Sequence, residues 1–324
     1  MAPLNFSRIG VMNSKELQSA ADILMIRPVR FGANPETLAS NRFQAPQPAL
    51  ADSTAQRAAA AEFDGLVAAL REAGVIVHVI DDTPEPHTPD SLFPNNWVSF
   101  HADGSVVLYP MLAPNRRAER RNDVLEELSA ARGFRITRLL DLTAHENRGK
   151  FLEGTGSLVL DRVHRIAYAC VSPRTDLDVL GDFAQQLDYD IVAFEAVDAA
   201  GAAIYHTNVL MCIGTRFAAV CSACIREDER AAVIDALRTT GHAIVDLSME
   251  QLGAFAGNML ELRSARAGDV VAMSTRARDS LSPQQRDLIE LHAGPIVATP
   301  IPTIETLGGG SVRCMLAEIH LPKK

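Results

Sequence analysis

The apolar residues of the chain recur in a fixed order: two short apolar runs around a polar turn, an amphipathic stretch, and a third apolar run. The segment 157-SLVLDRVHRIAYACVSPRTD-176 contains the first two runs. Apolar residues at the spacing of one helix face then follow at Leu180, Phe183 and Leu187. The third run is 190-DIVAFEAV-197. Because paired apolar runs around a short turn are typical of a hairpin, this pattern predicts a ββαβ unit.

The same unit recurs along the chain at intervals of about fifty residues, a spacing that indicates a repeat architecture. Complete copies are predicted over 96–142, 157–197, 208–248 and 258–303. The helix of the last copy begins with 282-SPQQ-285, a capping box with proline at the first helical position. This copy therefore carries a local signal for where its helix begins.

A fifth copy is divided between the two ends of the chain. The segment 21-ADILMIRPVR-30 matches a second strand, and a helix across 53–73 and a strand at 75-VIVHVID-81 follow it. This copy lacks a first strand, and 312-VRCMLAEIHL-321 has the composition to supply one. Pairing of these two segments would close the repeats into a ring, which is favourable because a ring leaves no exposed sheet edge.

We therefore predict an α/β fold, a five-bladed α/β propeller of ββαβ repeats with pseudo-fivefold symmetry. The whole chain, 1–324, forms a single domain in this interpretation. Its first blade combines 312–324 with 21–82, and the four complete copies form the other blades. An open solenoid with capped ends is the alternative architecture.

Composition narrows the classes of function. The 324 residues are 47% apolar and 22% charged, which is ordinary for a globular protein. Asp and Glu outnumber Lys and Arg by 40 to 31, and this net charge of -9 argues against nucleic acid or anionic membranes as partners. The densest basic run, 116-RRAERR-121, is interpreted as the solvated start of a helix.

The chain contains no run of about 18 apolar residues and no signal-peptide pattern at its N-terminus, so we expect a soluble, cytosolic protein. Its five cysteines are an odd number in a long chain, which favours free thiols over a disulfide framework. Cys221 and Cys224 have the spacing of a redox pair or of one half of a zinc site. The sequence has no second pair of this kind, so we expect buried thiols here and not a zinc or redox site. A homo-oligomer is compatible with the sequence.

Polar side chains occur at equivalent positions of the five units. In a ring, the segments that lead into each first strand lie at the same height around the axis. These segments are 93-FPNNW-97, 151-FLEGTGS-157, 206-HTNVL-210, 256-AGNML-260 and 310-GSVRCM-315. They contain Asn96, Glu153, His206, Asn208, Asn258 and Cys314. A thiol, an imidazole and a carboxylate facing one cavity are the usual components of covalent catalysis.

Three glycines, Gly308, Gly309 and Gly310, precede this cysteine. Glycine lets the backbone approach a substrate closely and offer N–H groups, and it allows a loop to open and close. We therefore expect a mobile rim in which Gly309 and Gly310 contact the substrate. A plain flexible turn before a buried structural cysteine is the simpler alternative.

Taken together, the motifs resemble the guanidine-modifying superfamily of arginine deiminases and amidinotransferases, and most closely its citrulline-utilisation hydrolase branch. The segments that carry the resemblance are 25-MIRPVRFGANPET-37, 93-FPNNWVSFH-101, 151-FLEGTGSLVLDR-162, 206-HTNVLM-211 and 308-GGGSVRCM-315. The resemblance implies a five-bladed propeller and a catalytic site without a metal or organic cofactor. It further implies that Cys314 is the nucleophile, His206 the general acid and base, and Glu153 a carboxylate that binds substrate nitrogen.

Three positions depart from the family pattern. Members that act on guanidinium usually carry aspartate at the positions of Asn96, Asn208 and Gly156. A guanidinium is a cation with only donors, so it favours anionic partners. A ureido group is neutral, and a buried aspartate facing it would be under-compensated, whereas asparagine offers both a donor and an acceptor. The departures therefore favour citrulline over arginine.

The resemblance also indicates which residues bind the α-carboxylate of the substrate. Arg174 and Arg116 follow the second strands of their units and resemble the arginines that bind an α-carboxylate in deiminases. Arg226 and Arg276 recur at similar repeat positions, so a structural role for these arginines is the alternative.

The resulting hypothesis is a cysteine-dependent hydrolase that attacks the ureido carbon of citrulline or a similar amino acid. A protonated His206 donates to the departing amine, a carbamoyl thioester remains on Cys314, and water then yields ornithine, ammonia and carbon dioxide. An arginine deiminase or an amidinotransferase acting on a guanidino substrate is the first alternative. A non-catalytic propeller that serves as a binding module is the second.

Overall fold

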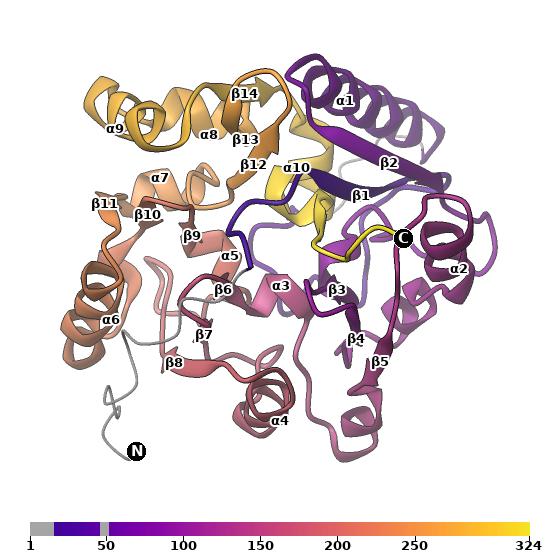
Figure 1. Ribbon diagram of the computed structural model, residues 1–324, viewed down its shortest axis with the longest axis horizontal. Helices are drawn as coiled ribbons and strands as arrows, with labels where there is room; N and C mark the ends of the chain where they lie inside the picture. Colours follow the sequence, from indigo (N-terminus) through magenta and orange to yellow (C-terminus); the bar gives the residue numbers. More distant parts are fainter. Residues whose placement is uncertain (1–15, 46–51) are drawn as a thin grey trace.

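The repeats of the sequence appear as five small sheets of three strands each (Figure 1). The computed structural model describes residues 16–45 and 52–324. Its strands are β1 (Asp22–Arg27), β2 (Ile76–Asp81), β3 (Val98–Phe100), β4 (Ser105–Leu108), β5 (Arg138–Asp141), β6 (Val159–Asp161), β7 (Ile166–Cys170), β8 (Asp190–Phe194), β9 (Met211–Ile213), β10 (Phe217–Val220), β11 (Ala243–Asp246), β12 (Leu260–Ser264), β13 (Gly268–Ser274), β14 (Ile296–Thr299) and β15 (Ala317–Ile319).

Every sheet has the same topology. Its first strand runs antiparallel to the second, and the second runs parallel to the third, as β6, β7 and β8 illustrate. A parallel pair cannot be joined by a tight turn, so a helix connects the second strand to the third. The ββαβ unit predicted from the apolar pattern is therefore confirmed.

One sheet is built from both ends of the chain. β15 pairs antiparallel with β1, with Asp22 opposite Ile319 and Leu24 opposite Ala317. β1 then pairs in parallel with β2 along its whole length. The C-terminal segment thus supplies the first strand that the N-terminal unit lacks, as its sequence predicted.

The five sheets follow one another around the middle of the molecule (Figure 1). β15 contacts β3, the short helix before β6 contacts β3, β6 contacts β9, and β9 contacts β12. A bridge between Ala20 and Leu262 then joins the last sheet to the first unit. Contacts therefore run from each unit to the next, and from the unit that contains β12 back to the unit that contains β1.

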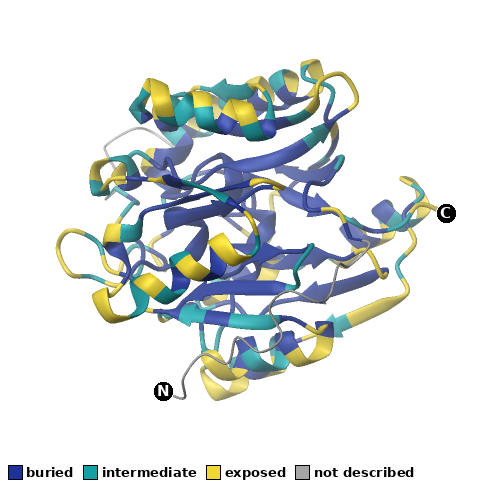
Figure 2. Cartoon of the chain, turned by 60° about the vertical axis from the view of Figure 1, so that its left-hand side comes forward, coloured by how far each residue is buried: buried dark blue, intermediate teal, exposed yellow. Residues whose placement is uncertain are grey.

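Helices form the outer part of each unit, and their outward faces are exposed, as are many of the loops between elements (Figure 2). The connecting helices are α1 (Asp52–Glu72), α2 (Asn122–Ala130), α4 (Leu177–Leu187), α6 (Glu227–Thr239) and α9 (Pro283–Ala293). The predicted capping box of α9 is present, with Ser282 accepting from the Gln285 N–H. Within 16–45 and 52–324, no helix has the length and apolar character needed to cross a membrane.

The apolar face of each connecting helix packs onto its sheet. In α4 the predicted face of Leu180, Phe183 and Leu187 is buried, with at most 4% of any of these residues exposed. Burial of such a side chain stabilises the fold by about 1.5–3 kcal/mol. The described residues thus form four buried apolar clusters, one of which is shared by α6 and α9, and these clusters hold the helices onto the sheets.

Short helical turns lead into the first strands and were not apparent in the sequence. They are α3 (Gly154–Ser157), α5 (Thr207–Leu210) and the 3₁₀ helices Pro94–Asn96 and Val312–Met315. The remaining helices are α7 (Met249–Gly253), α8 (Thr275–Ser280), α10 (Pro302–Gly308) and the 3₁₀ helices Pro114–Glu119, Thr143–Arg148 and Ser222–Cys224. α3 contacts both α5 and the Pro94–Asn96 turn, so the turns gather side chains from different units.

Candidate active site

Three of these turns direct polar side chains into one pocket. Asn96 ends its 3₁₀ turn, His206 caps the N-terminus of α5, and Cys314 lies within the turn before β15. The pocket holds about 260 Å³ of space between atoms. It is lined by Thr37, Asn41, Asp90, Phe93, Asn96, Arg116, Arg174, Tyr205, His206, Gly308, Gly309, Gly310 and Cys314. Residues far apart in the sequence therefore meet as the repeat pattern predicts.

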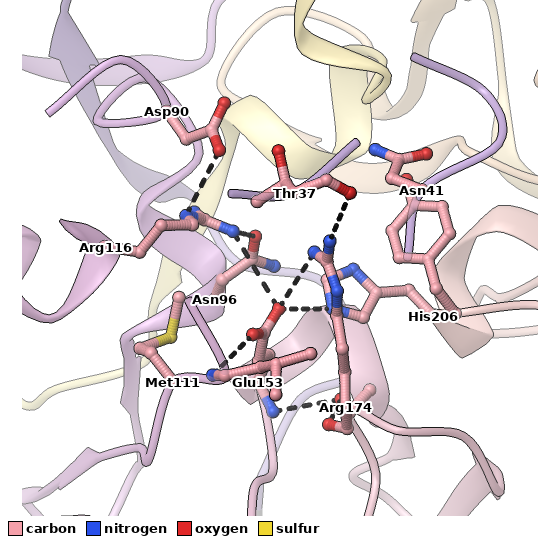
Figure 3. A network of polar contacts seen from close by, with 12 residues as sticks. Thr37, Asn41, Asp90, Asn96, Met111, Arg116, Glu153, Arg174 and His206 are labelled. Carbon is pink, nitrogen blue, oxygen red and sulfur yellow. Dashed lines mark hydrogen bonds and ion pairs between the residues drawn. The ribbon is translucent and has the colours of Figure 1, made fainter. Parts of the chain in front are cut away.

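Glu153 lies behind the pocket wall and holds the histidine (Figure 3). Its Oε2 is 2.8 Å from His206 Nε2, 3.3 Å from Arg174 Nη1 and 3.8 Å from Arg116 Nη1. Its Oε1 accepts from the backbone N–H of Leu112 at 3.0 Å. Both carboxylate oxygens are thus occupied by protein groups. Glu153 is not among the residues that line the pocket, because it sits behind His206. A contact between Glu153 and substrate nitrogen therefore stays a prediction.

The charges around this pair set its protonation. Burial would raise the pKa of Glu153, but the Arg174 guanidinium and the hydrogen bond with His206 outweigh it and hold that pKa well below its usual range. Burial lowers the pKa of His206 to about 4, although Glu153 opposes this shift. At neutral pH the imidazole is therefore uncharged, which differs from the protonated starting state expected from the sequence.

The sulfur of Cys314 is surrounded by amides. Asn258 Nδ2 lies 3.3 Å and Asn208 Nδ2 lies 3.5 Å from Sγ. Neither asparagine is among the residues that line the pocket. Asn208 lies beside the Cys314 sulfur, because the α5 turn directs its amide toward that atom, and a contact of Asn208 with substrate stays a prediction.

Arg116 is buried, which corrects the interpretation of 116–121 as a solvated run. Only 2% of it is exposed, and its Nε and Nη2 each donate to Glu119 at 2.9 Å. Its Nη1 donates to Asn96 Oδ1 at 2.9 Å, and Asp90 Oδ2 is 3.6 Å from Nε. Burial raises the pKa of Glu119 to about 7 against the opposing charge of Arg116. A buried guanidinium requires such carboxylate partners.

Arg174 joins the pocket to the N-terminal loop. Its Nη2 donates to Ser40 Oγ at 2.7 Å and to the carbonyl of Thr37 at 3.4 Å. Its guanidinium also lies 5.0 Å from the centre of the Tyr205 ring. Arg174 and Arg116 thus both face the pocket while being paired with carboxylates, and a role toward an α-carboxylate stays a prediction.

The glycine run is packed closely, in contrast to the expected mobile rim. The carbonyl of Gly309 accepts from Tyr205 Oη at 2.6 Å and from Asn41 Nδ2 at 3.1 Å. Gly309 has a φ of +63°, and a Cβ there would lie 2.5 Å from the Asn41 amide. A Cβ at Gly308 would lie 2.8 Å from the Phe93 ring. Glycine is required here because other groups approach the backbone, which is a packing reason more than a flexibility reason.

Several pocket residues were missed by the sequence analysis. Thr37, Asn41 and Tyr205 lie outside the segments that lead into first strands, so the repeat gave no signal for them. Asp90 lies in the proline-rich loop 83-TPEPHTPDS-91, which also precedes the segment that leads into a first strand. Its Oδ2 accepts from Asn34, whereas its buried Oδ1 has no hydrogen-bond partner within the described residues. Burial raises the pKa of this carboxyl, and Arg116 opposes the rise.

Gly156 explains one departure from the family pattern. A Cβ at this position would lie 2.4 Å from Asn96 Nδ2 and 2.7 Å from His206 Nδ1. The space that an aspartate side chain would occupy is therefore filled by the amide and the imidazole.

Residues 27–321 match the family model described as N,N dimethylarginine dimethylhydrolase, eukaryotic. The chain belongs to this family. It is thereby an enzyme of the guanidino-modifying superfamily that its motifs resemble. No match was found among curated proteins.

Solved structures share the fold. A variant of the N-terminal domain of ArgZ, covalently bonded to a reaction intermediate, is 18% identical with a TM-score of 0.70, covering 93% of this chain and 99% of the domain. Unliganded AgrE is 19% identical with a TM-score of 0.71, and the match covers 94% of this chain and 40% of AgrE. A dimethylarginine dimethylaminohydrolase adduct with S-methyl-L-thiocitrulline is 13% identical with a TM-score of 0.61, covering 93% and 100%. ArgZ is described as an arginine dihydrolase from the Ornithine-Ammonia Cycle in Cyanobacteria.

Proposed function

We propose that the protein is a cysteine-dependent hydrolase that cleaves the ureido group of citrulline or a similar amino acid. The products are the corresponding amine (ornithine from citrulline), ammonia and carbon dioxide. The observation that carries this proposal is the amide of Asn96, which lines the pocket together with His206 and Cys314. Within the described residues, the polar contacts of the Cys314 sulfur also come from amides, those of Asn208 and Asn258. Uncharged donors and acceptors around the reacting centre suit a neutral ureido group better than a guanidinium.

The chemistry begins with a neutral imidazole. His206 removes the thiol proton as Cys314 Sγ bonds to the ureido carbon, and the carbonyl π electrons move to oxygen. Collapse of this tetrahedral intermediate breaks the bond to the δ-nitrogen, which takes the proton from His206 and leaves as ornithine. Water, deprotonated by His206, then attacks the carbamoyl thioester. The C–S bond breaks, the departing thiolate takes the proton back from His206, and the carbamic acid released decomposes to ammonia and carbon dioxide.

Glu153 supports both proton transfers. The imidazolium formed during attack lies 2.8 Å from its carboxylate, which carries a negative charge because its pKa is held low. A charge-assisted hydrogen bond of this kind stabilises the imidazolium more than the neutral ring. His206 can therefore gain a proton transiently although the pKa of its resting state is only about 4.

The amino-acid end of the substrate fits the charged side of the pocket. Arg116 and Arg174 offer N–H groups to an α-carboxylate, as the family resemblance implies. The unpaired Oδ1 of Asp90 is an acceptor for an α-ammonium group. A zwitterionic α-amino acid carries the two charges that complement these arginines and this aspartate, whereas a simple urea carries neither.

Arginine is the second candidate substrate. ArgZ is described as an arginine dihydrolase, and AgrE has been solved with L-arginine bound. Asp90 and Glu153 supply negative charge close to the pocket. Hydrolysis of arginine by the same residues would release ammonia first and give citrulline as a first product.

We also infer that the five sheets are the blades of a closed propeller in a single domain spanning 1–324. The pairing of β15 with β1 and the bridge between Ala20 and Leu262 support this arrangement. Pseudo-fivefold symmetry explains why equivalent turns of four units carry the proposed site residues.

The proposed function is tested by incubating the protein separately with citrulline and with arginine and separating the products. We expect ornithine from citrulline, and a Cys314→Ala variant should lose at least about a thousandfold of this activity because the nucleophile is removed. Full ornithine release by Cys314→Ala would reject the mechanism. Turnover of arginine without turnover of citrulline would instead favour the second candidate.

A further inference from the structure

Asn258 lies beside the Cys314 sulfur but takes no part in the proposed proton transfers. Its side chain is fully buried, and it is not among the residues that line the pocket. It nevertheless makes the shortest polar contact of the Cys314 sulfur, 3.3 Å from Nδ2 to Sγ. A group so placed can act on the sulfur without touching the substrate.

A second hydrogen bond fixes the orientation of this amide. Asn258 Nδ2 also donates to the main-chain carbonyl of Asn208 at 2.9 Å. A carbonyl oxygen only accepts, so the nitrogen and not the oxygen of the amide must face Asn208. The second N–H of the same nitrogen is then free to point at the sulfur. Oδ1, 3.7 Å from Sγ, is the acceptor available while the thiol is protonated.

The local sequence explains how Asn258 reaches this position. Asn258 ends a turn in which its N–H donates to the carbonyl of Phe255 at 2.9 Å, and β12 begins two residues later. A Cβ at Gly257 would lie 2.5 Å from the carbonyl oxygen of Val209. Glycine thus allows the turn to approach the backbone of α5, which carries Asn208. The segment 256-AGNML-260 therefore delivers one amide to the sulfur from the unit that contains β12, β13 and β14.

We propose that Asn258 is a positioning residue that stabilises the Cys314 thiolate through an N–H donor held in place by the Asn208 carbonyl. An N–H donor favours the thiolate over the thiol, as other donors do at reactive cysteines. An aspartate in the same place would repel the thiolate. The inference rests on the proposed role of Cys314 as nucleophile, but it requires no particular substrate.

The test is the rate at which iodoacetamide alkylates Cys314 between pH 5 and pH 10, followed by mass spectrometry of its peptide. Asn258→Ala should slow alkylation at pH 7 roughly tenfold, the loss of one hydrogen bond to a charged group. Asn258→Asp should slow it further and move the midpoint of the pH profile upward by about one unit or more. Asn122→Asp, which adds the same charge at an exposed position, serves as the matched control and should keep the wild-type profile.

The outcomes separate this inference from the proposed function. If wild-type Cys314 is not alkylated near neutral pH, the thiol is not an activated nucleophile and both proposals are overturned. If the wild type reacts and folded Asn258→Asp shows an unchanged profile, only the role of Asn258 is overturned. Thermal unfolding establishes folding, and should Asn258→Asp not fold, a wild-type profile in Asn258→Ala or Asn258→Ser is the contradicting result.

Discussion

Glu153 is the single anion that joins an imidazole and two guanidinium groups beneath the pocket. It lies within 4 Å of His206, Arg174 and Arg116, and all four side chains are almost fully buried. Removing one partner of such a buried group leaves an uncompensated charge, which typically lowers the free energy of unfolding by about 3–5 kcal/mol. Glu153 therefore contributes to the fold, in addition to its role in the proposed proton transfers.

The buried imidazole predicts a loss of stability on acidification. The pKa of His206 is about 4 in the folded protein against an ordinary value of 6.5. Between these values the unfolded chain binds more protons, so the stability is complete above pH 6.5 and falls as the pH decreases toward 4. The expected slope is roughly 1.4 kcal/mol per pH unit. His206→Gln should remove this contribution, as measured by urea unfolding at several pH values between 7 and 4.5.

The control for this measurement is His87→Gln, which changes an exposed histidine. It should retain the wild-type dependence on pH. An unchanged slope in His206→Gln would contradict the assignment, because the remaining buried histidines, such as His101 and His320, are present in all three proteins.

The short helix α3 sets the distance between the pocket residues. Gly154 has a φ of +47° and passes close to the carbonyl of Asn95, and Gly156 contacts Asn96 and His206. Neither glycine can be replaced without moving a neighbour. The four residues of α3 thus hold the imidazole and the Asn96 amide in register.

Substitution of two glycines by alanine should have opposite effects. Gly156→Ala should destabilise the protein by about 1–3 kcal/mol, because its Cβ would overlap Asn96 and His206, and activity should fall with it. Gly65 lies on the exposed face of α1, and a Cβ added there would have no atom within 4 Å. Gly65→Ala should therefore stabilise the protein by about 0.5–1 kcal/mol. Urea unfolding of both variants measures these effects. Equal stability of Gly156→Ala and wild type would contradict the packing described for α3.

The sequence predicts elements that repeat and misses those that do not. The ββαβ units, the pairing of β15 with β1 and the pocket positions of His206 and Cys314 follow from one recurring apolar pattern. Asp90 and Tyr205 lie in connections whose path depends on tertiary packing, so no local pattern indicates them. The direction of Asn208 depends on one helical turn, and a change of one residue in that turn would point the amide elsewhere.

The molecule as a whole depends on the strand that joins its two ends. Ala317, Ile319 and Leu321 are buried with the cores of the first two units. Their burial contributes about 5 kcal/mol, which approaches the full stability of many proteins. Loss of β15 would also expose the backbone groups of β1 that pair with it.

A chain truncated after Leu316 is therefore expected to lose its cooperative unfolding transition. Circular dichroism during thermal unfolding measures this loss. A chain that lacks only Lys324, an exposed residue, should unfold like the full-length protein. Cooperative unfolding of the longer truncation near the normal temperature would show that the fold does not require this strand.

The two hydrogen bonds on the Gly309 carbonyl join segments that lie far apart in the chain. Asn41 belongs to the same N-terminal loop as Thr37 and Ser40, which contact Arg174. Tyr205, the other donor, directly precedes His206. One carbonyl oxygen therefore ties the N-terminal loop and the segment of His206 to the glycine run that leads to Cys314, so a shift in any one of the three is transmitted to the other two.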